Sequence, residues 1–267
     1  MHDLLALYAS IGLFAGLAQI AYLGVAFGVG GVLLVRGHRA GEWTQWVLGL
    51  HLLLSMGIGY VLTSVGVISV EFGAPLPESL LPWMVGGGYA SSSLGLCLTL
   101  DFTRRVFRPG RTGALAIAFA CGLAIWAGWL GYALTGGIFH GRFVGGWYWV
   151  MTGGMVATNV WVAWEPILYF ARLRKRVRLG LAEPVVANRM LLWGIGSVAR
   201  AVLVPAGPIG NSWMAGLDES ARLSAGAVVL VITSTLGLIT GVAYWLTFQP
   251  PQAYLRWVEA RAGKRVA

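Results

Sequence analysis

The sequence predicts an all-α, polytopic integral membrane protein with seven transmembrane helices, its N-terminus outside and its C-terminus cytoplasmic. Three observations predict this: the composition, the apolar stretches of bilayer length, and the uneven distribution of Lys and Arg. Of the 267 residues, 57% are hydrophobic and only 11% are charged. Soluble domains carry about a quarter charged residues, so a water-soluble globular fold is excluded. Intrinsic disorder is excluded too, because disordered chains have low hydrophobicity.

Seven stretches are long and apolar enough to cross the hydrocarbon, which needs about 20 residues. Hydropathy places these spans at roughly 11–35, 43–68, 82–101, 114–136, 146–170, 189–209 and 223–247. Aromatic residues flank several of the predicted ends, where amphipathic rings meet the interface. The chain therefore divides into a transmembrane domain at 1–248 and a short basic amphipathic cytoplasmic tail at 249–267.

The basic residues decide the predicted orientation. Of the 19 Lys and Arg residues, the great majority lie in the gaps at 36–42, 102–113 and 171–189 and in the tail. Only Arg142 and Arg222 lie in gaps on the opposite side. The positive-inside rule places the Lys- and Arg-rich gaps in the cytoplasm. The net charge of +9 is thus spread over short loops, which excludes nucleic acid as a partner because no basic domain face exists.

Small residues are expected to hold the helices together. Inside lipid, helices associate where glycine, alanine and serine allow close backbone approach. The sequence offers such spacings throughout: Gly12/Gly16, Gly24/Gly28, Gly86–Gly88 with Ser91–Ser93, Gly153–Gly154 and Gly237/Gly241. The glycine clusters follow no strand of a βαβ unit, so they do not predict a nucleotide site.

Three ionisable residues lie inside the predicted spans, and each is a candidate functional residue because charge is costly there. From the cytoplasmic end, a rise of 1.5 Å per residue places Glu165 about 9 Å deep, His51 about 12 Å deep and Arg200 about 16 Å deep. We expect Glu165 to pair with Arg200, because a lone charge in hydrocarbon is expensive. His51 is expected to complete the cluster, and Pro166 next to Glu165 predicts a kink. The alternatives are a structural ion pair, a conformational or proton-linked switch, and direct catalysis.

Polar residues that lie deeper in the predicted spans extend the candidate site. Asn159 and Ser92 are expected either to line a polar pocket or to hydrogen-bond between helices. Asp101, at the end of the third span, is expected to pair with Arg104 or Arg105. We therefore name as ligand or switch residues His51, Ser92, Asn159, Glu165 and Arg200.

Several chemistries are excluded by residue type. A covalent retinal pigment needs a lysine in the seventh span, but Lys175 and Lys264 both lie in cytoplasmic segments. A bis-histidine haem needs paired ligands in the bilayer, and His51 is the only histidine there. No HExxH, GxSxG or ligand-spaced His/Cys set occurs. We therefore expect no catalytic residues, no metal, no cofactor and no enzymatic activity.

Three stretches resemble an uncharacterised family of bacterial seven-helix inner-membrane proteins. They are LDFTRRVFRP at 100–109, RVRLGLAEPVVANRMLLWGIGSVAR at 176–200 and WLTFQPPQAYLRW at 245–257. The resemblance implies a multi-pass location in the bacterial inner membrane and no particular activity. The layout is also similar to the seven-helix sensor regions of bacterial signalling proteins, which is an analogy of fold alone.

The function expected from these features is that of a sensor or receptor. An apolar or amphipathic ligand would enter a pocket among spans 2, 3, 5 and 6, and the signal would pass to a separate cytoplasmic protein. The expected partners are that protein and the anionic lipid headgroups of the inner leaflet. The alternatives are a small transporter or channel that uses Glu165, Arg200 and His51, and a structural subunit of a membrane complex. The expected cytoplasmic contact residues are Arg172, Arg174, Lys175, Arg176 and Arg178.

Overall fold

The computed structural model describes residues 2–71, 77, 79–140 and 145–263, and all of its regular elements are helices. Arg142 and Lys264, which were assigned to a loop and to the tail, lie outside the described residues. The elements are α1 (His2–Ala40), α2 (Trp43–His51), the π-helix η1 (Leu52–Ile58), α3 (Gly59–Glu71), α4 (Leu81–Phe107), α5 (Thr112–Leu134), α6 (Gly137–His140), α7 (Gly146–Arg178), α8 (Pro184–Met214), α9 (Glu219–Phe248) and α10 (Gln252–Gly263).

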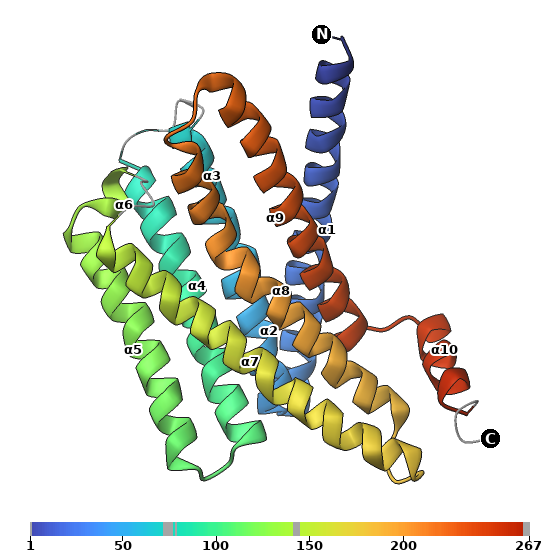
Figure 1. Cartoon of the computed structure of the whole chain (residues 1–267). Coiled ribbons are helices and arrows are strands. Elements are labelled where there is room, and N and C mark those ends of the chain that lie inside the picture. Colours follow the sequence, from blue (N-terminus) through green and yellow to red (C-terminus); the bar gives the residue numbers. More distant parts are fainter. Residues whose placement is uncertain (1, 72–76, 78, 141–144, 264–267) are drawn as a thin grey trace.

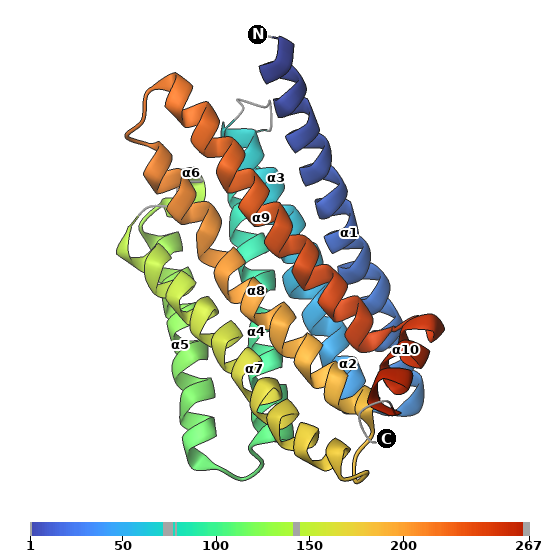
Figure 2. The same ribbon diagram turned by 45° about the vertical axis from the view of Figure 1, so that its right-hand side comes forward.

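The long helices run side by side as a bundle, with α10 set apart at one end (Figure 1). Along the chain, α7 packs against α8 and α8 against α9, while α9 closes back onto α1. Figure 2 shows α1 and α9 together on one flank and α5 on the other. Short connections join α1 to α2 and α4 to α5, and Gly41 (φ 66°) and Gly110 (φ 71°) supply the left-handed conformation that these turns need.

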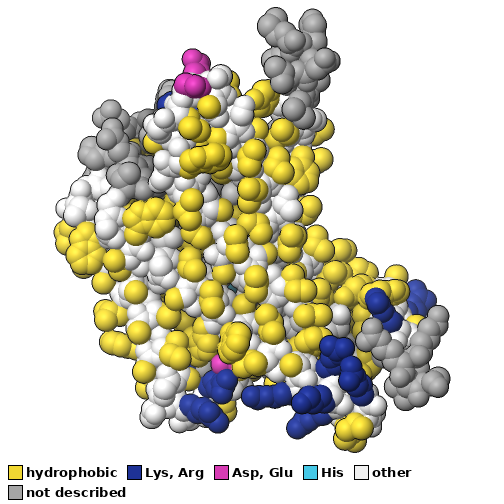
Figure 3. Space-filling model, viewed as in Figure 1, with side chains coloured by type: hydrophobic (Ala, Val, Ile, Leu, Met, Phe, Trp, Pro, Cys, Tyr) yellow, Lys and Arg dark blue, Asp and Glu magenta, His cyan; other side chains and the backbone are white. Residues whose placement is uncertain are grey.

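A helix lies at each of the seven predicted spans. Five helical stretches are long and apolar enough to cross a membrane: 8–40, 43–66, 112–134, 184–214 and 219–248. Apolar side chains cover most of the face in Figure 3, whereas Lys and Arg gather at the end of the bundle near α10. Large apolar residues such as Leu134 and Phe119 are 78% and 68% exposed. Such a surface suits a multi-pass membrane protein, since lipid covers apolar side chains at no cost.

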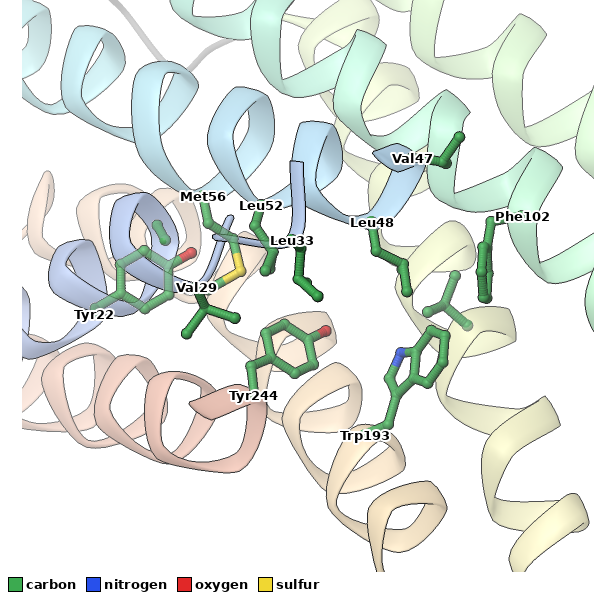
Figure 4. Packing of buried hydrophobic residues seen from close by; sticks show 12 residues of the cluster. Tyr22, Val29, Leu33, Val47, Leu48, Leu52, Met56, Phe102, Trp193 and Tyr244 are labelled. Carbon is green, nitrogen blue, oxygen red and sulfur yellow. The ribbon is translucent and has the colours of Figure 1, made fainter. Parts of the chain in front are cut away.

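The buried core contains two main clusters. The first joins α1, α2, η1, α4, α7, α8 and α9, and Figure 4 shows its aliphatic side chains facing Tyr244 and Trp193. The second lies among α4, α5, α6 and α7 around Tyr132, Tyr148 and Met151. The two clusters meet at α4 and α7, which makes these helices the centre of the bundle.

Close helix packing occurs at some of the expected glycines and not at others. A Cβ at Gly88 would lie 2.7 Å from the backbone nitrogen of Thr63, and one at Gly154 would lie 3.0 Å from that of Ile125. In contrast, a Cβ at Gly12, Gly16, Gly24 or Gly28 would meet nothing within 4 Å. The packing prediction is therefore wrong for the two glycine pairs of α1. Two glycines four residues apart share one face of a helix, but their spacing does not tell whether a neighbouring helix covers that face.

Two acidic side chains make defined contacts at helix ends. Asp101 pairs with Arg104 (2.6 Å) and with Arg105 (2.8 Å), which confirms the predicted interfacial pairing. Asp218 caps α9 by accepting from the backbone N–H of Ala221 at 2.8 Å. That hydrogen bond, together with the Ser220 hydroxyl, holds the pKa of the Asp218 carboxyl below its usual range.

Candidate functional site

Arg200 is the centre of the candidate site. Its side chain lies in the middle of the bundle and the residue is only 5% exposed. Nη1 lies 3.1 Å from Nε2 of His51, and Nη2 donates to the Ser55 hydroxyl. The sequence prediction that His51 and Arg200 lie together is confirmed, while Ser55 was not predicted as a partner.

The protonation of His51 follows from these contacts. A guanidinium has no acceptor atom, so Arg200 must donate and Nε2 of His51 must accept with its lone pair. The proton of the neutral ring is then on Nδ1, which lies 2.9 Å from the Gly95 carbonyl oxygen and donates to it. His51 therefore fixes Arg200 to α4 without adding a second positive charge.

The contacts of His51 and Ser55 with Arg200 coincide with the π-helix η1, which joins α2 to α3. It begins directly after His51 and contains Ser55, so the wide turns lie where the chain contacts Arg200. π-Helical turns are rare and occur frequently at functional sites. Gly95 of α4 lets η1 approach closely, because a Cβ there would lie 2.9 Å from the Ser55 backbone nitrogen. The apolar sequence LLLSMGI gives no periodic signal for such a segment, and it was predicted only as part of a span.

A cavity of about 390 Å³ adjoins Arg200. It lies toward the end of the bundle at which α4 and α7 begin and α8 ends, and α1, η1, α3 and α9 also contribute to its wall. Many of the lining side chains carry a hydroxyl or an amide: Gln19, Tyr22, Ser55, Tyr60, Thr63, Ser64, Tyr89, Ser92, Tyr148, Thr152, Asn211 and Thr233. Apolar side chains complete the wall, chiefly Leu96, Met155, Leu203, Val204 and Pro208.

Arg200 is the only charged side chain among the described residues that line this cavity. Within those residues, no carboxylate forms an ion pair with it. Moving an ion out of water costs several kcal/mol even after the protein relaxes. Within the described part of the chain, the site is thus a buried cation beside a polar cavity, with neutral partners and no protein counter-ion.

Glu165 does not pair with Arg200, so that prediction is wrong. Its carboxylate accepts from Nε of Arg108 at 2.8 and 3.0 Å and from Nε1 of Trp161 at 3.2 Å. Arg108 follows the last residue of α4 and extends along the bundle, as long arginine side chains do. Glu165 therefore joins α7 to the end of α4, and the expected three-residue cluster separates into two sites.

The remaining predicted residues fall in different places. Ser92 lines the cavity. Asn159 is buried and does not line the cavity, and its amide donates to the Met155 carbonyl oxygen one turn earlier at 2.8 Å. The cytoplasmic contact residues predicted at the end of α7 are all exposed: Arg172, Arg174, Lys175, Arg176 and Arg178. Within the described ranges, no three His, Cys, Asp or Glu side chains gather as metal ligands do.

Comparisons with protein-family models, with curated proteins and with solved structures find no match. No family is therefore identified from the resemblance of the three sequence stretches. The chain is a helical, multi-span membrane-like protein, and its function must be argued from the cavity and its chemistry.

Proposed function

We propose that the protein is a seven-helix receptor of the bacterial cytoplasmic membrane whose central cavity binds a small amphipathic anion. The observation that carries this proposal is the buried Arg200, which lies beside a polar cavity and has no carboxylate partner among the described residues. A ligand carboxylate or similar group would supply the missing charge. Pockets of 300–1,000 Å³ with a few fixed polar groups suit small ligands.

Seven spans and a cytoplasmic C-terminus are part of this proposal. The helices α4 and α7 contain 27 and 33 residues and lie in the centre of the bundle. With the five apolar stretches they make seven crossings. The Lys- and Arg-rich end then faces the cytoplasm, and the cavity lies in the outer half of the membrane.

The chemistry of the wall supports an amphipathic ligand over a simple ion. Leu96, Met155 and Val204 form apolar surface a short distance from Arg200 and from the hydroxyl groups. An anionic head would accept hydrogen bonds from the guanidinium, and an apolar tail would contact the aliphatic side chains. Charge-assisted hydrogen bonds contribute about 1.5–3 kcal/mol each, so Arg200 would dominate the affinity.

A receptor is favoured over a transporter or channel because buried side chains fill the bundle between the cavity and its basic end. Tyr244, Trp193 and Phe102 belong to one buried cluster between Arg200 and the basic end of the bundle. We propose that ligand binding shifts α7 and α8, which pack together along their length. The exposed basic end of α7 would then contact a separate cytoplasmic signalling protein.

Binding of matched probes to the purified full chain tests the proposal. We expect hexanoate to raise the melting temperature and to bind, whereas hexan-1-ol and hexylammonium do not. Arg200→Gln should weaken hexanoate binding about 10- to 100-fold. The control is Arg111→Gln, which makes the same charge change at an exposed turn outside the cavity and should bind as the unmodified protein does.

Two results would contradict the proposal. Equal binding of hexanoate and hexan-1-ol to the unmodified protein would remove the role of charge, even if Arg200→Gln does not fold. Steady hexanoate flux in proteoliposomes, abolished in Arg200→Gln, would replace the receptor with a transporter that uses the same site.

A further inference from the structure

A second groove lies at the basic end of the bundle, between the end of α7, the start of α8 and α10. Its volume is about 790 Å³. It shares no lining residue with the cavity beside Arg200. It is lined by Phe170, Arg174, Val177, Arg178, Pro184, Ala187, Asn188, Leu191, Trp257, Val258 and Arg261.

Three arginines give the groove a single sign of charge. Arg174 and Arg178 are four residues apart on α7 and therefore share one face of the helix. Arg261 comes from α10, where its guanidinium lies 5.2 Å from the ring centroid of Trp257. No acidic residue is found among the described side chains that line the groove. The groove is thus complementary to a multiply contacted anion such as a phosphate.

The start of α8 shapes the groove without adding a hydrogen-bond donor to it. Pro184 and Ala187 both line the groove. Proline has no backbone N–H, and the N–H of Ala187 donates to the Glu183 carbonyl oxygen at 3.3 Å. The arginine side chains therefore provide the charge complementarity to an anion.

The rest of the wall is apolar and leads toward the lipid. Phe170, Val177 and Leu191 line the groove. Further along the same two helices, Trp164 of α7 is 57% exposed and Ile195 of α8 is 41% exposed. A bound molecule can therefore place a charged group among the arginines and extend an apolar chain along the outside of the bundle.

The third wall of the groove is held in place by specific contacts. The Asn188 amide of α8 donates to the Tyr254 hydroxyl of α10 at 2.7 Å. Val258 of α10 is only 8% exposed, so this helix packs one face inward. The position of α10 beside α8 is therefore a feature of the fold and not of a free tail.

We propose that this groove is a binding site for one anionic phospholipid. The phosphate contacts Arg174, Arg178 and Arg261, and an acyl chain lies along the apolar wall. Basic pockets between helices at the cytoplasmic side suit anionic headgroups. An acidic protein segment would match the arginines but would leave the apolar path along α7 and α8 unused, so lipid is favoured.

The test compares two double variants of the full chain with equal loss of charge. Arg174→Gln/Arg178→Gln removes two groove arginines, and Arg172→Gln/Arg176→Gln removes two exposed arginines of the same helix end that do not line the groove. Binding of phosphatidylglycerol is measured in detergent, with phosphatidylcholine as the neutral reference. Each basic residue near an anionic lipid contributes about 1 kcal/mol. We therefore expect the groove variant to bind phosphatidylglycerol on the order of 30-fold more weakly and the control to stay within about threefold.

Equal losses in the two double variants would overturn the proposal, because they would indicate diffuse surface charge. An unchanged affinity in the groove variant would overturn it as well. Stronger binding of an acidic peptide than of phosphatidylglycerol, lost in the groove variant, would assign the groove to a protein. Arg200→Gln should retain phosphatidylglycerol binding, so this result is separate from that of the cavity proposal.

Discussion

At the scale of single residues, Glu165 and Arg200 are both buried charged residues, but they have different kinds of partner. Glu165 receives a full counter-charge from Arg108, and the Trp161 indole donates to it as well. From the residues that the structure describes, Arg200 receives only neutral side-chain partners, His51 and Ser55. The first arrangement is complete without a ligand, and the second leaves one positive charge for an anion to match.

The ion pair between α4 and α7 predicts a pattern of coupling. Glu165→Gln and Arg108→Gln should each destabilise the purified protein by about 2–4 kcal/mol, because each leaves a charge without its partner in a largely buried place. The double variant should lose clearly less than the sum. Glu165 and Arg200 share no contact among the described residues, so the losses of stability caused by Glu165→Gln and Arg200→Gln should be additive. Thermal or denaturant unfolding of both cycles measures this, and a strong Glu165–Arg200 coupling would contradict the structure.

The sequence predicted which residues are unusual and that His51 lies beside Arg200, but it failed on the partner of Glu165. Glu165, His51 and Arg200 stood out because charge is rare inside apolar spans. Their depths came from the helical rise, but the rise does not tell which face each side chain occupies. Arg108 was assigned to a cytoplasmic loop, and its reach into the bundle left no signal in the sequence. Ser55 was not predicted because the π-helix that presents it has no periodic pattern.

At the scale of elements, a helix lies at each predicted span and five helical stretches are long and apolar enough to cross a membrane, but the helix boundaries and contacts needed the structure. Helix α7 continues to Arg178, well beyond the predicted end at 170, because the last turns need only water or headgroups around them. Helix α1 ends at Ala40 because the next residue, Gly41, has a positive φ that does not continue an α-helix. The close approach of η1 and α3 to α4 depends on small residues that face a neighbour, which only the packing decides.

Two adjacent glycines of α4 test this packing with a matched pair of variants. A Cβ at Gly88 would lie 2.7 Å from the Thr63 nitrogen and 3.0 Å from the Gly59 oxygen, whereas one at Gly87 would meet nothing within 4 Å. Gly88→Ala should therefore destabilise the protein by about 1–3 kcal/mol through overpacking. Gly87→Ala should be neutral or stabilising by up to about 1 kcal/mol, since alanine favours helix. Melting temperatures measure both, and equal effects would contradict this contact between α3 and α4.

At the scale of the whole molecule, Lys and Arg side chains gather at the end of the bundle near α10 (Figure 3). In a membrane this asymmetry sets the orientation. In the orientation that we propose, the Arg200 cavity lies on the outer side, and the groove beside α10 and the exposed end of α7 lie on the inner side. A ligand from outside and a partner inside would then act on the same two helices, α7 and α8.

Accessibility labelling tests this orientation. In a background with Cys97→Ala and Cys121→Ala, single cysteines replace Arg176 at the end of α7 and Ser220 at the start of α9. A membrane-impermeant maleimide applied to intact cells should label Ser220→Cys and not Arg176→Cys. Labelling of both positions would mean that α8 does not cross the membrane, and labelling of Arg176→Cys alone would invert the topology.

The most direct test of the central claim is the density around Arg200 in an experimental structure of the protein purified with its native lipids. We expect elongated density in the cavity, with one end within hydrogen-bond distance of the guanidinium and the other along Leu96 and Met155. Water-sized density alone, or a guanidinium that turns away to meet Glu165, would contradict the claim that a ligand supplies the counter-charge.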